Sequence, residues 1–151
     1  MRIVPAFFTG MDKAMKKATA YIDGTCMGNP GRAGIGVALY DECGKLFYET
    51  SQCIGMATNN IAEYQALIHA LEKAEKFGCD TLLVYTDSEL LARQINGFYK
   101  VKDEKLKSLF LKAKQLMRSF KDIRVRHIDR KKNKYADNLA SRSVWNQNSD
   151  N

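Results

Sequence analysis

Four acidic side chains stand where a folded chain could bring them into one cleft. Asp23 and Asp87 each follow a short β-type run, and Glu63 and Asp137 each fall near the start of a helical pattern. The carboxyl ends of neighbouring parallel strands share one edge of an α/β sheet, and ligands bind at that edge. We therefore expect these four carboxylates to converge there.

A cluster of this kind predicts a divalent metal site. Four negative charges in one cleft raise one another's pKa unless a cation neutralises them, so the alternative is a costly accident of sequence. Carboxylate oxygens without a nearby thiol or imidazole favour Mg²⁺ or Mn²⁺. Two such ions ~4 Å apart can activate a water nucleophile and stabilise the departing oxygen of an in-line phosphodiester cleavage. The hypothesis is metal-dependent phosphodiester hydrolysis.

Each acid also has an ordinary structural explanation. An aspartate after a strand is often a turn former, and one before a helix is often an N-cap. The interpretation as a metal site therefore rests on the joint placement of all four residues and on none of them singly.

The bulk composition fits one basic domain. The chain has 151 residues, 45% of them hydrophobic, and 24 Lys and Arg against 17 Asp and Glu give a net charge of +7. This length and apolar content suit a single core, and the charge favours an extended anionic partner such as nucleic acid. We place the domain at residues 18–145, between an N-terminal extension of unassigned role at 1–17 and a polar, disordered tail at 146–151.

Several classes of site and location are disfavoured. The four cysteines show no paired short spacing, and the two histidines do not complete a soft-metal set, so a zinc site is not expected. No secretory leader is recognisable, which predicts reduced thiols and a cytoplasmic protein. No apolar run approaches the roughly 18 residues that a membrane span needs. We expect a soluble monomer without membrane contact.

Hydrophobic periodicity predicts a mixed sheet with helices on both faces. The expected strands lie at residues 19–22, 35–40, 45–52, 81–86 and 123–127, with a hairpin turn at 41–44. The expected helices are one capped by Asn59 and Asn60 that stops at Gly78, one capped by Asp87 and Ser88, a long one within 103–121 and one around 136–144. The run at 81–86 is apolar enough to indicate a central strand covered on both faces.

Four short segments together resemble the motifs of type 1 ribonuclease H. They are YIDGTCMGNPG at residues 21–31, TNNIAE at 58–63, YTDS at 85–88 and NKYADNLA at 133–140, in that order along the chain. Each contains one of the four acids, so the resemblance and the analysis of spacing indicate the same residues. The similarity runs from Ala18 to about Val144.

The resemblance implies a fold, a reaction and a substrate. The fold would be ribonuclease H-like, an α/β fold with a five-stranded mixed sheet of order 3-2-1-4-5 and helices on both faces. Asp23, Glu63, Asp87 and Asp137 would be both the catalytic residues and the ligands of two Mg²⁺ ions. The substrate would be an RNA–DNA hybrid, whose RNA strand is hydrolysed. The sequence leaves open whether Mn²⁺ is preferred and whether double-stranded RNA is also cut.

The same resemblance implies a set of substrate contacts. The residues that would face the minor groove, where 2′-hydroxyls distinguish RNA from DNA, are Cys26, Asn29, Asn59, Asn60 and Ser88. Thr58 would seat a DNA phosphate. The glycines of the first motif region, Gly28, Gly31, Gly34 and Gly36, would permit tight turns and a close approach of the backbone to a sugar-phosphate chain.

Two departures from the better-studied bacterial pattern concern substrate grip and a histidine. Residues 96–107 are too few for the long basic, Trp-containing protrusion of that pattern. Residues 129–136, which form the loop before Asp137, lack the mobile histidine usually found there. We hypothesise that Arg130 partly replaces this histidine near the leaving phosphate. The cations that would grip the substrate instead are Lys121, Arg124, Arg126, Arg130, Lys131, Lys132 and Lys134, although the alternative is a solvated basic face.

Two rival functions remain to be weighed. The first is a non-catalytic module of the same fold that binds hybrid or double-stranded RNA, which would be expected to lose the carboxylates that this chain retains. The second is another nuclease or strand-transfer enzyme of this fold. A proofreading exonuclease would want a second acid two residues after Asp23, where Thr25 stands, and integrase-like cores lack the helix motif around Glu63.

Overall fold

The computed structural model describes residues 17–149, with side chains described to Trp145. The strands are β1 (Lys17–Gly28), β2 (Gly31–Tyr40), β3 (Leu46–Ala57), β4 (Thr81–Thr86) and β5 (Asp122–His127). The helices are α1 (Asn59–Lys76), α2 (Glu89–Ile95), α3 (Glu104–Met117) and α4 (Lys134–Ser149), with a short 3₁₀ helix at Arg130–Lys132. Apart from Lys17, which begins β1, the proposed N-terminal extension lies outside the described residues, as do residues 150 and 151 of the proposed tail.

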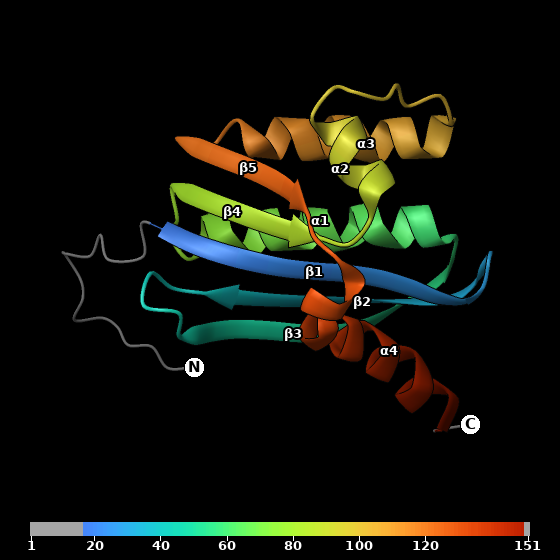
Figure 1. Cartoon of the computed structure of the whole chain (residues 1–151). Coiled ribbons are helices and arrows are strands. Elements are labelled where there is room, and N and C mark those ends of the chain that lie inside the picture. The colour runs from blue at the N-terminus through green and yellow to red at the C-terminus, as the bar shows by residue number, and fades with distance from the viewer. Residues whose placement is uncertain (1–16, 150–151) are drawn as a thin grey trace.

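One five-stranded sheet has the order β3-β2-β1-β4-β5 (Figure 1). The β1–β2 and β2–β3 pairs are antiparallel, whereas β1–β4 and β4–β5 are parallel. The predicted mixed sheet and its strand order are therefore confirmed. The parallel pairs place the carboxyl ends of β1 and β4 at the same edge.

Helices cover the two faces of the sheet unequally. Helix α1 packs on one face, with α2 and α3 beside it, and α4 lies alone on the other face over β1, β2 and β3 (Figure 1). The prediction that β4 is covered on both faces is wrong. Its burial alternates, with Leu82 and Val84 in the core and Leu83 and Tyr85 only half-buried, because α4 packs on β1, β2 and β3.

Two glycines of β2 let α4 approach the sheet closely. A Cβ atom at Gly36 would lie 2.2 Å from the carbonyl oxygen of Ala136, and one at Gly34 would lie 2.9 Å from that of Ala140. Both distances are too short for a side chain. The prediction that these glycines admit a sugar-phosphate backbone is therefore wrong for Gly34 and Gly36, which admit a helix.

Several element ends differ from the prediction. Strand β1 continues past Asp23 to Gly28, because its second half pairs with β2 in a long hairpin. Thr58 caps α1, since its Oγ1 accepts a hydrogen bond from the backbone N of Ile61 at 3.2 Å, and the expected caps Asn59 and Asn60 are the first helical residues. Helix α4 extends to Ser149, so residues 146–149 are helical and do not form the disordered tail that we expected.

No helix among residues 17–149 combines the length and the apolar character needed to cross a membrane.

Candidate active site

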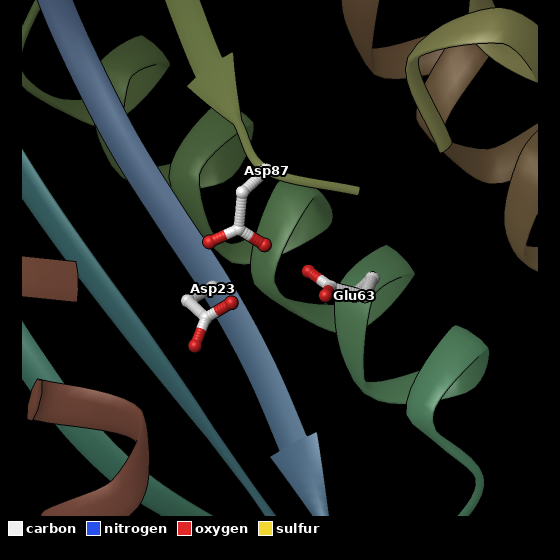
Figure 2. A group of neighbouring side chains, drawn as sticks. All are labelled: Asp23, Glu63 and Asp87. Carbon is white, nitrogen blue, oxygen red and sulfur yellow. The ribbon is translucent and has the colours of Figure 1, made fainter. Parts of the chain in front are cut away.

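Three of the four predicted carboxylates converge on one point. One oxygen each of Asp23, Glu63 and Asp87 can be chosen so that all three lie within 4.8 Å of one another. Figure 2 shows the three side chains directed toward a common space, Asp23 from β1, Glu63 from α1 and Asp87 from just past the end of β4. The parallel β1–β4 pairing ends where Ile22 faces Thr86, so the two aspartates follow directly on neighbouring strands.

A close contact between backbones brings Glu63 to the two aspartates. A Cβ atom at Gly24 would lie 2.3 Å from the carbonyl carbon of Ala62, so only glycine allows α1 to rest on β1 at this level. The backbone N of Gly24 donates a hydrogen bond to Glu63 Oε1 at 3.1 Å. Glu63 is thereby held beside Asp23, the residue that precedes Gly24.

Asp137 reaches the cluster from the opposite face of the sheet. Gly36, on which Ala136 rests, is the cross-strand partner of Asp23, so the first turn of α4 lies directly beside that residue. The Asp137 carboxyl is near enough to hydrogen-bond with Asp23 and contributes to its raised pKa. It remains outside the group of three whose oxygens share one point.

The electrostatics of the cluster favour a cation. Asp23 is 5% exposed and Glu63 9% exposed. Burial, followed by the charges of Asp87 and Asp137, raises the pKa of Asp23 to about 8. Burial and the charges of Asp23 and Asp87 also raise the pKa of Glu63 well above its usual value, and the Gly24 hydrogen bond and Arg130 only partly offset this. Converging hard oxygen donors that resist ionisation fit a divalent ion such as Mg²⁺ or Mn²⁺.

The predicted substrate contacts fall into two groups near the cluster. Cys26, Asn29 and Asn59 form one group, since the Cys26 thiol donates to Asn59 Oδ1 at 3.2 Å and the Asn59 backbone N donates to Asn29 Oδ1 at 3.0 Å. Asn29 also lines a surface hollow with Thr58, Asn60 and the start of α3. Ser88 lies apart at the start of α2, where its Oγ caps the helix by accepting from Leu91 N at 3.1 Å.

Arg130 lies beside the acidic cluster, as its hypothesised role requires. Its Nε is 3.9 Å from Asp137 Oδ2, and its side chain is 77% exposed. Its charge lowers the pKa of Asp23 and of Glu63. His127, at the end of β5, is exposed to solvent.

All seven cations predicted to grip the substrate are exposed. They occupy β5, the segment before it, the 3₁₀ helix and the start of α4. Two of them have an acidic oxygen within 4 Å, since Arg124 Nε lies 3.5 Å from Asp122 Oδ1 and Arg130 Nε lies 3.9 Å from Asp137 Oδ2.

Asn133 is a residue at the site to which the sequence analysis gave no role. Its Nδ2 donates to the Ile22 carbonyl oxygen at 2.8 Å and to Asp87 Oδ2 at 3.1 Å. The available signal was its place at the start of the fourth motif, but an uncharged residue before a helix has a ready explanation as a cap.

Comparison with known proteins identifies the family. Residues 21–143 match the reverse transcriptase-like family, and because the match covers most of the chain, the chain belongs to that family. The resemblance to type 1 ribonuclease H is confirmed by the relatives and solved structures that follow.

Two relatives each match most of this chain. Ribonuclease HI of Halobacterium salinarum is 40% identical over 125 residues, which cover 83% of this chain and 63% of that protein. The bifunctional protein Rv2228c of Mycobacterium tuberculosis is 39% identical over 126 residues, which cover 83% of this chain and 35% of that protein. The chain thus spans less than two thirds of either relative.

Solved structures share the whole fold. The crystal structure of RNase H1 from Halobacterium salinarum superposes with a TM-score of 0.84 at 38% identity, covering 86% of this chain and 98% of that one. The crystal structure of LC11-RNase H1 in complex with an RNA/DNA hybrid gives a TM-score of 0.81 at 43% identity, again covering 86% and 98%.

Proposed function

We propose that this protein is a ribonuclease H that hydrolyses the RNA strand of RNA–DNA hybrids endonucleolytically. The observation that carries the proposal is the convergence of Asp23, Glu63 and Asp87 on one point, with Asp137 beside them. The family membership and the likeness to a ribonuclease H1 crystallised with a hybrid support the same substrate.

Each part of the site has a task in this reaction. Asp23, Glu63, Asp87 and Asp137 would hold two Mg²⁺ ions, with Mn²⁺ able to replace them. When bound, these ions supply an activated water and neutralise charge at the scissile phosphate. The group formed by Cys26, Asn29 and Asn59 presents amide and thiol groups at the same edge of the sheet, where 2′-hydroxyls of the RNA strand can be recognised.

The test is incubation of the purified protein with labelled hybrid, duplex RNA and duplex DNA, each with Mg²⁺, Mn²⁺ or a chelator. The proposal expects cleavage of the RNA strand of the hybrid only when a metal is present. Binding of hybrid or duplex RNA without any cleavage would instead support a non-catalytic module of this fold. Cleavage of duplex RNA would widen the substrate class.

The salt dependence of binding tests the basic surface. If about three of the seven exposed cations contact phosphates, the logarithm of hybrid affinity should fall with the logarithm of salt concentration with a slope of about −2.7. That slope corresponds to a loss of about 40-fold between ~50 and ~200 mM salt. Fluorescence anisotropy with a labelled hybrid in chelator measures it, and a flat response would exclude these cations as contacts.

Arg130→Ala tests the electrostatic substitute for the missing histidine. We expect kcat on hybrid to fall about tenfold with little change in KM, because an exposed guanidinium near the leaving phosphate stabilises charge that develops during reaction. Arg118→Ala, at an exposed arginine at the end of α3, serves as the control. Unchanged turnover in Arg130→Ala would remove this role.

A further inference from the structure

Asn133 joins the three elements on which most of the acidic cluster depends. Its side chain is buried, with 1% exposed, and its Nδ2 bonds both the Ile22 carbonyl oxygen and Asp87 Oδ2. The backbone carbonyl oxygen of Asn133 accepts a hydrogen bond from the Asp137 backbone N at 3.0 Å. One residue therefore contacts the strand that carries Asp23, the carboxylate of Asp87 and the first turn of α4.

The chemistry of the bridge explains why an amide is needed. A side-chain NH₂ carries two protons, one for each of the two acceptors that Asn133 faces. An acid at this position would set oxygen lone pairs against a carbonyl and a carboxylate, and a hydroxyl could donate to only one of them. The bond to Oδ2 also restricts rotation of the Asp87 carboxylate, since a charge-assisted hydrogen bond is stronger than a neutral one.

The other end of the Asn133 amide is unsatisfied. Within the described residues, Asn133 Oδ1 is buried and has no hydrogen-bond partner. An unsatisfied buried acceptor lowers the stability of the fold, whereas an apolar side chain of the same size would avoid that cost. The gain must therefore come from the two bonds that Nδ2 makes.

We propose that Asn133 is a positioning residue for the metal site, because the bridge from Ile22 O to Asp87 Oδ2 sets the spacing of Asp23 and Asp87 before an ion binds. The inference rests on the proposed function, which assigns these acids to metal. Its effect falls on metal affinity, since outer partners that orient metal ligands typically contribute 10–100-fold to affinity.

Asn133→Leu is the direct test, because leucine has nearly the same size and no donor. We expect the dissociation constant for Mn²⁺, measured on the free protein by electron paramagnetic resonance titration, to rise about 10–100-fold. The Mg²⁺ concentration for half-maximal cleavage should rise by the same factor. At saturating metal, kcat and the KM for hybrid should return close to the wild-type values, which a general structural defect would not allow.

Asn96→Leu is the matched control. Asn96 Nδ2 also donates to a backbone carbonyl oxygen, that of Val125 at 3.0 Å, but no acidic side chain shares that bond. The Mn²⁺ affinity of the Asn96→Leu variant should equal that of the wild type. Unchanged affinity in Asn133→Leu, or an equal loss in both variants, would overturn the positioning role.

A measurement on the wild-type protein covers the case in which Asn133→Leu does not fold. In a Mg²⁺ titration followed by nuclear magnetic resonance, the side-chain amide signal of Asn133 should shift as the site fills, and that of Asn96 should not. A stationary Asn133 signal would overturn the proposal. If Asp87→Asn abolishes cleavage while Asn133→Leu binds metal normally, only the positioning role fails, whereas an active Asp87→Asn would remove the proposed function itself.

Discussion

Replacing Asp87 with asparagine should abolish metal-dependent cleavage of hybrid while leaving the protein folded. The change removes one of three converging carboxylates but keeps the shape of the side chain, and its amide oxygen can still accept the bond from Asn133. We expect kcat to fall by at least ~10³-fold, which corresponds to about 4 kcal/mol of lost transition-state stabilisation. Single-turnover cleavage of a labelled hybrid measures this.

The control for this experiment is Glu72→Gln. Glu72 belongs to α1, as Glu63 does, but it lies on the exposed surface with its Oε2 3.8 Å from Lys112 Nζ. Its removal should leave cleavage unchanged. A folded Asp87→Asn protein that cleaves at the wild-type rate would end the assignment of a metal-dependent nuclease.

With metal chelated, the stability of the wild-type protein should fall as pH rises from about 4 to about 8. The pKa of Asp23 is raised from 3.8 to about 8, so the folded state holds a proton in this range that the unfolded state has lost. Stability decreases with pH wherever the folded state binds more protons than the unfolded state. Glu63, whose pKa is raised for similar reasons, acts in the same direction.

Asp23→Asn should remove much of this pH dependence. We expect the variant to be more stable than the wild type by about 2–3 kcal/mol near pH 8, a rise of several degrees in Tm, and nearly equal to it near pH 4. Thermal unfolding followed by circular dichroism across this range gives the difference. Added Mg²⁺ should stabilise the wild type near pH 8 more than the variant, and a wild-type stability that rises with pH in chelator would contradict the account.

The acids and the sheet were predictable because their signals are local. Asp87 follows a short apolar run that forms strand β4, and Glu63 lies one turn into the helix α1 that the hydrophobic periodicity predicted. The strand order, which hydrophobic periodicity does not determine, came from the resemblance of the four motifs to type 1 ribonuclease H. The predicted approach of Asp23 to Asp87 needed only that β1 and β4 be parallel neighbours.

The remaining features depend on contacts between segments far apart in the chain. The roles of Gly24 and Gly36 follow from helices that pack on opposite faces of the sheet. The residues next to these glycines in the sequence do not indicate which helix will pack there. Thr58, Asn59 and Asn60 can all cap a helix, and the sequence does not show which of the three does so; in the structure it is Thr58. Asn133 carries no charge, so its hydrogen bonds to Ile22 and Asp87 become visible only in three dimensions.

The two glycine contacts have a consequence for how this chain can change over evolutionary time. At Gly24 and Gly36, the helices that bear Glu63 and Asp137 approach the main chain of the sheet with no side chain between them. A single added methyl group at either glycine would therefore displace a helix together with the acid that it carries, so neither position can accept even alanine without loss of the site.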